Sequence, residues 1–286
     1  MPTSTLSQTY FARSLACAKS SDYVARLNAI YPVRATQSRF RTDPEALADV
    51  MAYLRADNYD AAARVMLDKV KFPRFPLPTW HSTIFRNHPG QRTDEAIAIV
   101  AKYLRCAPLT AEYVEQFCSM QPQANRQTTG FHDWVAAGAN LGRGTGFPVK
   151  YFWDDTDGPW LIRGDDAHLK IEARQAGIYR DGGKGLDLLA KSVGGQVVWG
   201  EAKLLSDTGG NQDKSLRELL GLGQSKDGVP VAIIDGDPWL KMLILKDLPM
   251  DGEDKNAALL HQIHKSAMSG AIFLSALTLP DLLRTI

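Results

Sequence analysis

Three charged residues interrupt two otherwise apolar stretches in the second half of the sequence. Asp187 lies in GLDLLAK, and Glu201 and Lys203 lie in VVWGEAKLL. Two carboxylates can hold a divalent cation, which offsets the charge of a phosphodiester and lowers the pKa of a bound water. A lysine beside them can orient that water or stabilise the charge that develops around phosphorus. These residue types therefore predict phosphodiester hydrolysis.

The ligand atoms of this set indicate which cation it should prefer. Carboxylate oxygens are hard ligands, and the sequence has no histidine or cysteine close to Asp187 or Glu201. Such ligands favour Mg²⁺, with Mn²⁺ as a substitute, over Zn²⁺. We therefore expect a magnesium site made of oxygen ligands.

The chemistry requires Asp187 and Glu201 to face each other, and the turn between their strands decides whether they do. The two stretches are typical of antiparallel strands joined at glycines. A two-residue turn would place Asp187 opposite Ala202, on the wrong face. A three-residue loop at 193–195 places it opposite Glu201, and the last glycine of that loop can take the left-handed conformation required. A bulge at Gly200 would also correct the register.

A purely structural role for the same residues is the alternative. Glu201 and Lys203 could form a solvent-facing pair on an edge strand, with Asp187 as their partner across the ladder. However, the leucines, valines and tryptophan around them indicate strands that are covered on both faces. Burying three charges there is costly unless they have a function, which favours the catalytic interpretation.

The spacing Asp187, thirteen residues, Glu201-Ala202-Lys203 resembles the PD-(D/E)XK nuclease superfamily. The longer run GEAKLLSDTGGNQDKSLREL is similar to type II restriction endonucleases of that superfamily, in which a Gly-Gly-x-Gln segment and a helix follow the E-x-K strand. The resemblance covers roughly 165–280. One departure is Leu186, which stands where the superfamily name has proline.

This resemblance implies roles for each residue of the motif. Asp187 and Glu201 would be metal ligands, the backbone carbonyl of Ala202 a third ligand, and Lys203 the catalytic lysine. Glu172, on the preceding helix, stands where many superfamily members carry another acid and could bind the metal through water. An ordinary surface glutamate is the alternative for Glu172.

Contacts with DNA are expected from two loop segments, 126–129 and 143–146, and from the start of the helix that follows the Gly-Gly loop. Arginine can bind guanine and glutamine can bind adenine with two hydrogen bonds, and an N-capped helix after the Gly-Gly loop could meet a phosphate. These residues could equally be solvated. The candidates are Arg126, Gln127, Arg143, Asn211, Gln212 and Lys214.

The resemblance further implies a site-specific endonuclease that cuts double-stranded DNA and leaves 5′-phosphates. Such enzymes are commonly homodimers on palindromic sites, with a cognate DNA methyltransferase that protects the host. A DNA repair or junction-resolving nuclease of the same superfamily is one alternative, and a catalytically inactive DNA-binding protein is another. The sequence has no Walker A motif, so we expect no use of ATP.

The elements that must position this hairpin are predicted from apolar periodicity and capping residues. The first 120 residues indicate short helices only. The later sequence alternates strands and helices, which predicts an α/β (α+β) fold in which helices flank a mixed central β-sheet. Predicted helices are 1–31, 44–55, 58–70, 94–104, 110–120, 131–139, 167–177, 211–220, 255–268 and 277–286, and predicted strands outside the hairpin are 149–153, 159–163, 229–235, 239–245 and 270–276.

Charge and composition divide the chain in the same way. The net charge of +1 combines +6 in residues 1–150 with −5 in 151–286. A basic half that grips phosphates and an acidic half that holds a metal suit a nucleic-acid enzyme. We therefore predict a helical region for DNA embrace and dimerisation at 1–150 and a catalytic core at 151–286.

Cysteine usage and hydropathy indicate the compartment. The three cysteines are odd in number and have no CxxC spacing, which argues against a disulfide framework or structural zinc. No apolar stretch approaches the length of a membrane span, and the N-terminal residues do not form a secretory signal. We expect a cytoplasmic protein that has no membrane partner.

Overall fold

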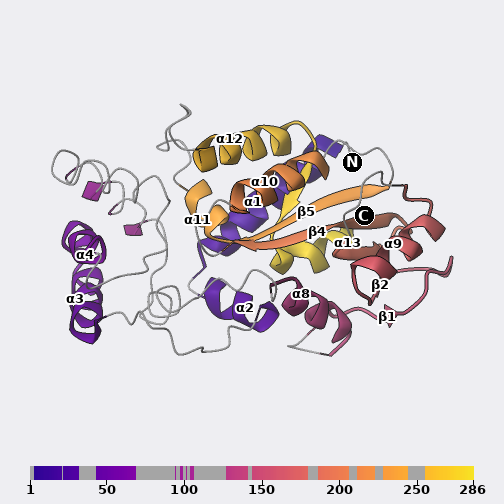
Figure 1. Cartoon of the computed structure of the whole chain (residues 1–286), viewed down its shortest axis with the longest axis horizontal. Coiled ribbons are helices and arrows are strands. Elements are labelled where there is room, and N and C mark those ends of the chain that lie inside the picture. Colours follow the sequence, from indigo (N-terminus) through magenta and orange to yellow (C-terminus); the bar gives the residue numbers. More distant parts are fainter. Residues whose placement is uncertain are drawn as a thin grey trace.

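A single β-sheet organises the part of the chain that the structure describes (Figure 1). The computed structural model describes residues 3–20, 22–31, 43–68, 127–140, 144–179, 186–205, 211–222, 228–243 and 255–286, with the helical residues 94, 97, 98, 101, 104 and 105. Within these ranges six strands pair in the order β1-β2-β3-β4-β5-β6.

The sheet is mixed. Strand β3 is antiparallel to both of its neighbours, β2 and β4, whereas β1 is parallel to β2, and β4, β5 and β6 run parallel. The strands are β1 Val149–Lys150, β2 Trp160–Ile162, β3 Leu188–Lys191, β4 Val197–Leu205, β5 Val229–Gly236 and β6 Ile272–Leu274. The predicted fold class is confirmed.

Helices pack around this sheet, and several begin at the caps expected from the sequence. The side chain of Asp43 accepts a hydrogen bond from the Glu45 amide, and that of Asp165 accepts one from the His168 amide at 2.9 Å. The helices are α1 Thr3–Ala18, α2 Tyr23–Ile30, α3 Pro44–Arg55, α4 Tyr59–Met66, α8 Gln127–Ala136, α9 Asp166–Gln175, α10 Asn211–Leu222, α11 Asp237–Met242, α12 Lys255–Met268 and α13 Leu279–Thr285. No helix in the described ranges is long and apolar enough to cross a bilayer.

The β3–β4 hairpin has the three-residue loop that the sequence predicts. The Ser192 amide donates to the Gln196 carbonyl at 3.0 Å, which leaves 193–195 as the loop. Gly195 takes the left-handed conformation, with φ of 79°. Leu188 pairs with Gly200 in the ladder. Side chains alternate along β4 from this register, so the two predicted charges of that strand share one face.

Gly200 is fixed by a close approach between strands. It pairs with Val231 of β5, and a Cβ at Gly200 would overlap the Val231 carbonyl oxygen. Its own carbonyl accepts a hydrogen bond from the Asp187 amide at 3.0 Å. Only glycine therefore fits at this position, where β4, the strand that carries Glu201 and Lys203, lies between β3 and β5.

The last residues of the chain hold the tip of the hairpin. The Val193 amide donates to the Leu283 carbonyl at 2.9 Å, and the Gly194 amide donates to the Ile286 carbonyl at 2.7 Å. A Cβ at Gly194 would lie 2.9 Å from the backbone of Ile286. Helix α13 thus supports the loop that sets the register.

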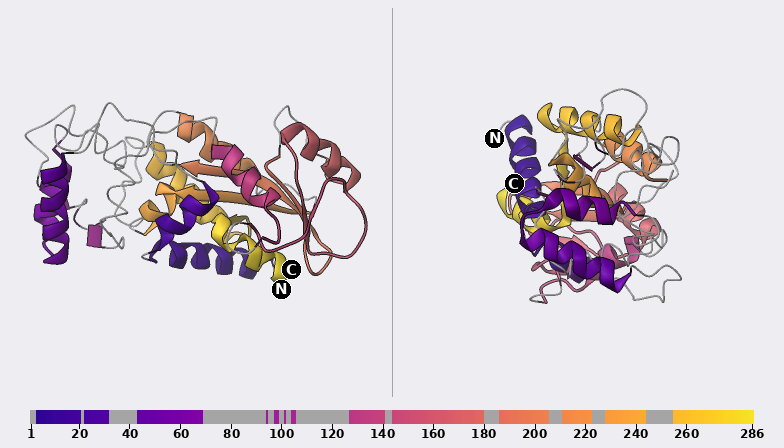
Figure 2. Two further views of the ribbon diagram at one scale, coloured as in Figure 1. Left: turned by 90° about the horizontal axis from the view of Figure 1, so that it is seen from below. Right: turned by 90° about the vertical axis from the view of Figure 1, so that its left-hand side faces the viewer.

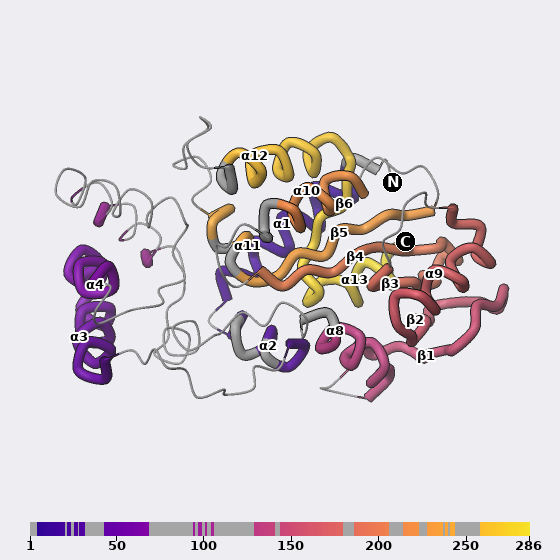
Figure 3. The backbone as a smooth tube through the Cα atoms, viewed as in Figure 1, coloured from indigo at the N-terminus to yellow at the C-terminus, as the bar shows by residue number. Residues whose placement is uncertain are grey.

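Helix α1 packs on the C-terminal part of the sheet, along β6, α11 and α12 (Figures 2 and 3). Its Ser7 hydroxyl donates to the Ala267 carbonyl at 2.7 Å, and Ser14 accepts from the Ser275 amide at 2.8 Å. The Tyr10 hydroxyl donates to Thr285 of α13 at 2.8 Å. The first helix and the last helix therefore lie side by side. The division of the chain at residue 150 stays a prediction.

Three predicted elements differ most from those observed. The strand predicted at 239–245 is wrong for residues up to 242, which form the end of α11, because Asp237-Pro238 begins a helix and Trp239 is buried with its indole donating to the Ile234 carbonyl. The helix predicted over 1–31 is broken between α1 and α2. The strand predicted at 149–153 is only two residues long.

Asp235, near the end of β5, is fully buried and accepts three hydrogen bonds. The donors are the hydroxyl of Tyr31 at 2.8 Å, the hydroxyl of Ser275, and the amide of Ala276 at 3.2 Å. Burial raises the pKa of Asp235 to about 7, although all three donors oppose that shift. The carboxyl group therefore joins α2 to the end of the sheet and holds its proton to near neutral pH.

We expect Asp235 to make the protein less stable as the pH rises through its titration range. Unfolded, it ionises near pH 4, whereas the folded protein keeps the proton up to about pH 7. The stabilising contribution is thus complete below pH 4 and lost above pH 7, a change on the order of 4 kcal/mol. Urea unfolding of wild type and Asp235→Asn should show the free-energy difference falling over this range. A difference that is independent of pH would contradict the assignment.

Candidate active site

The structure brings Asp187, Glu201 and Lys203 together on one face of the β3–β4 hairpin. The Lys203 Nζ lies 3.3 Å from Asp187 Oδ2 and 3.6 Å from Glu201 Oε2. Both acids are buried, with exposed fractions of 4% and 2%, whereas the side chain of Lys203 is 24% exposed. One partly exposed ammonium group therefore contacts two buried carboxylates, as the predicted register requires.

The Asp187 carboxylate is also bonded to the backbone of β4. Its Oδ2 accepts a hydrogen bond from the Ala202 amide at 2.9 Å. In an extended strand the N–H and C=O of one residue point to the same edge. The carbonyl of Ala202 therefore points toward the edge at which Asp187 lies, as expected of a backbone ligand beside that carboxylate.

The pKa of Asp187 is raised above its usual value. Burial is the largest cause, and the positive charge of Lys203 and the Ala202 N–H oppose it. A nearby negative charge, Asp166, adds to the rise. An added cation would offset both the burial and the repulsion, so the site has the electrostatic character of a cation-binding position.

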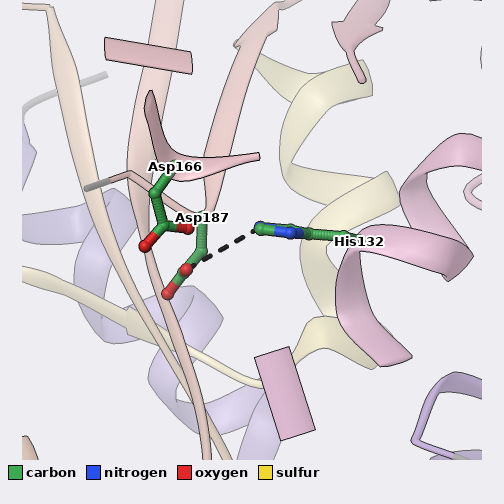
Figure 4. Close-up of side chains that lie close together, drawn as sticks. All are labelled: His132, Asp166 and Asp187. Atoms are coloured by element: carbon green, nitrogen blue, oxygen red, sulfur yellow. Dashed lines mark ion pairs between the residues drawn. The ribbon is translucent and has the colours of Figure 1, made fainter. Parts of the chain in front are cut away.

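Two residues that the sequence did not indicate as ligands join the cluster. His132 of α8 and Asp166 of α9 each offer one ligand atom that, together with one from Asp187, lies within 4.8 Å of the others (Figure 4). His132 Nε2 is 3.7 Å from Asp187 Oδ1. The expectation of a site without a histidine nearby is therefore wrong, because α8 packs on β4 and brings an imidazole from a distant part of the sequence.

A comparison with protein-family models gives a match over residues 8–256 to the Tsp45I type II restriction enzyme model. The chain belongs to this family. The predicted enzyme class, a restriction endonuclease with DNA as its substrate, is thus confirmed at the level of the family. Neither the curated proteins nor the solved structures gave a match.

In this restriction enzyme, Glu172 lies neither at the surface nor within the clustered ligand atoms. It is 1% exposed, and its Oε2 accepts a hydrogen bond from the Trp153 amide at 2.5 Å. The interpretation as a surface glutamate is wrong, because α9 turns this side chain toward the segment after β1. The acid of α9 that reaches the cluster is Asp166, in the first turn.

The residues predicted to contact DNA are only partly described for this Tsp45I-family enzyme. Arg126 and Arg143 lie outside the described residues. Gln127 begins α8, Asn211 and Gln212 begin α10, and Lys214 is exposed in the first turns of α10. Their contacts with DNA stay predictions.

Proposed function

We propose that this Tsp45I-family enzyme hydrolyses double-stranded DNA at a specific sequence by a Mg²⁺-dependent reaction of the PD-(D/E)XK type, leaving 5′-phosphate ends. One observation carries the proposal: a single lysine ammonium contacts two buried carboxylates, one directly before β3 and one on β4. Burial of two carboxylates beside an ammonium group lowers the stability of the fold. Binding of a metal ion and a phosphodiester would explain why these charges are placed there.

The residues fit the metal that such a reaction needs. Asp187 and Glu201 would hold Mg²⁺, with the Ala202 carbonyl as a further oxygen ligand, and Mn²⁺ could replace it. The raised pKa of Asp187 is consistent with this role, because a cation would restore the charged form. When bound, the metal supplies charge neutralisation at the phosphate and a more acidic water. Glu172 remains a proposed ligand only through water.

Lys203 would act on the phosphate and the water. Its ammonium group is a mobile donor of up to three hydrogen bonds, and it is exposed enough to meet a substrate. It would align the attacking water and stabilise the charge that develops on the phosphate oxygens, while the 3′ oxygen leaves. Asp187 and Glu201 keep the ammonium in place before DNA binds.

We infer the assembly and the biological setting from the family. A homodimer with two-fold symmetry would read a palindromic site and cut both strands. Arg126, Gln127, Arg143, Asn211, Gln212 and Lys214 are proposed to contact the DNA. A cognate DNA methyltransferase would protect the host, the reaction would need no ATP, and the enzyme would act in the cytoplasm.

Digestion of phage or plasmid DNA tests the proposal. With Mg²⁺ we expect discrete fragments that share one sequence and a 5′-phosphate at every end, and with excess EDTA no cleavage. Sequencing of the fragment ends identifies the site. A smear of fragments would favour a nuclease without sequence specificity, and DNA binding without any cleavage would show an inactive binding protein.

A further inference from the structure

Two large aromatic side chains lie exposed next to each other in the segment after β1. Tyr151 is 49% exposed and Phe152 is 64% exposed. Their rings meet edge to face with centroids 4.8 Å apart, and the ring of His168 on α9 stacks on Tyr151 at 4.3 Å. Single exposed apolar residues are normal on a protein surface, whereas contiguous groups mark binding sites. We call Tyr151, Phe152 and His168 the aromatic platform.

The backbone that carries the platform is fixed before any ligand binds. The Trp153 amide donates a hydrogen bond to the buried Glu172 carboxylate at 2.5 Å. His168 Nε2 lies 2.6 Å from the Tyr151 carbonyl oxygen, and this nitrogen must donate, because a carbonyl only accepts. A Cβ at Gly164 would overlap the imidazole of His168, so glycine leaves the room that this ring needs. The exposed rings therefore give up little conformational freedom on binding.

The platform lies beside the candidate active site. Asp166, whose carboxylate clusters with that of Asp187 within 4.8 Å, is in the first turn of α9, and His168 follows two residues later. Helix α9 and strand β1 lie together at one end of the sheet (Figure 1). A helix with its side chains is about 10 Å across, and bases follow one another about every 3.4 Å. DNA held at Asp187 therefore passes the platform within about three or four base pairs of the scissile phosphate.

The charges beside the platform permit contact with a nucleic acid. The exposed Arg163 places its guanidinium group 5.8 Å from the centre of the Tyr151 ring, where it can meet a backbone phosphate. Two nearby acids already have partners, because Asp154 accepts a hydrogen bond from Lys150 at 2.6 Å and Asp165 caps α9. The platform itself offers aromatic rings, and every base has a π-face on which such a ring can stack.

We propose that Phe152 inserts between base pairs of the bound DNA beside the scissile phosphate, supported from behind by Tyr151 and His168. Phe152 is the more exposed of the two large rings. Apolar wedges of this kind partly unstack one base step and bend the duplex, so that more of the DNA contacts the protein. Pyrimidine–purine steps open most easily, so the wedge adds selectivity at a step that no hydrogen bond reads. This role deepens the proposed nuclease function and rests on it for the position of the DNA.

Replacement of Phe152 tests the wedge through the affinity for DNA that contains the cleavage site, with Ca²⁺ in place of Mg²⁺ to suppress cleavage. We expect Phe152→Ala to weaken binding by about 5- to 150-fold, the cost of removing one base–aromatic stack. Phe152→Trp keeps an aromatic face and should retain most of the affinity. Tyr179→Ala is the matched control, because Tyr179 is 73% exposed and lies beyond the opposite end of α9. Its affinity should equal that of the wild type.

The fluorescence of 2-aminopurine reports unstacking directly, because its emission rises when the base leaves the stack. The analogue is placed in turn at each position within about four base pairs of the cut. The wild-type protein should raise the emission at one step, and Phe152→Ala should not. Unchanged emission at every position with the wild type, or a rise that persists in Phe152→Ala, would overturn the proposal.

Two comparisons separate the wedge from other outcomes. Specific cleavage by a wild-type protein that unstacks no base would remove the wedge and leave the nuclease assignment standing. A protein that binds phage DNA fragments without cutting them, and binds them more weakly as Phe152→Ala, would keep the contact and remove the nuclease. A changed sedimentation coefficient of Phe152→Ala with unchanged DNA affinity would show that the platform binds a second copy of the chain, which would overturn the proposal.

Discussion

Replacement of Lys203 by methionine should lower the rate of DNA cleavage by on the order of 10²- to 10³-fold, the usual cost of losing one donor that stabilises transition-state charge. Methionine preserves much of the apolar length of the side chain and removes the ammonium that contacts Asp187 and Glu201. The loss should appear in the single-turnover rate, whereas the affinity for DNA containing the site should change little.

The cleavage rate of Lys203→Met needs one control for the loss of a positive charge and another for loss of folding. Lys191→Met, on the adjacent strand β3, removes an ammonium that lies 6.0 Å from the Trp153 ring and should leave the cleavage rate unchanged. Thermal unfolding must confirm that the Lys203 variant is folded, because the substitution removes the ammonium group that contacts two buried carboxylates. Near wild-type cleavage by a folded Lys203→Met protein would refute the assignment of Lys203.

Replacement of Gly200 by alanine is expected to have the largest effect on stability. The new Cβ would overlap the carbonyl oxygen of Val231, which is backbone in the middle of the sheet and cannot move aside. Forcing β4 and β5 apart should cost about 3 kcal/mol or more. Because Glu201 is the next residue, we also expect cleavage to be lost in the fraction that folds.

A second glycine offers a matched control. Gly221 lies near the end of α10, and a Cβ there would meet nothing within 4 Å. Gly221→Ala should therefore leave cleavage unchanged and stabilise the protein by about 0.5–1 kcal/mol, since glycine is a poor helix residue. Urea unfolding of both variants measures the contrast. Equal stability of Gly200→Ala and wild type would mean that β4 and β5 are not paired as described.

The predicted core of the site was local in the sequence, and this explains why it could be found there. Asp187 directly precedes β3, and Glu201 and Lys203 lie on β4. The hairpin loop between them has three residues, so its length and the conformation of Gly195 determine the register. The observed ladder has the predicted phase. The class of the fold followed in the same way, from the alternation of strands and helices after residue 150.

His132 and Asp166 join the cluster through tertiary packing, which local sequence patterns do not predict. His132 reaches Asp187 only because α8 packs on β4, and Asp166 does so because α9 packs on β3. In sequence, Asp166 is indistinguishable from a helix-capping residue, and a lone histidine in an amphipathic helix has no special spacing. The adjacent acids at 165–166 were the one available hint, since a single acid suffices for a cap.

The strand wrongly predicted at 239–245 shows that the composition of a short apolar segment does not determine its secondary structure. Its apolar residues suit either a strand or a buried helix, and a short run does not distinguish them. The proline at position 238 decided the outcome, because its fixed φ suits the first turn of a helix. Trp239 then became a core residue, packed edge-on against Phe11 of α1.

The contacts between the two ends of the chain affect when the enzyme can become active in a cell. The hairpin loop is held by Leu283 and Ile286, and α1 is held by Ser275 and Thr285. A growing chain emerges from the ribosome with its N-terminus first, so α1 can form these contacts only after residues 275–285 have been synthesised. Completion of the sheet is therefore a late event, and incomplete products of translation should be unable to cut DNA.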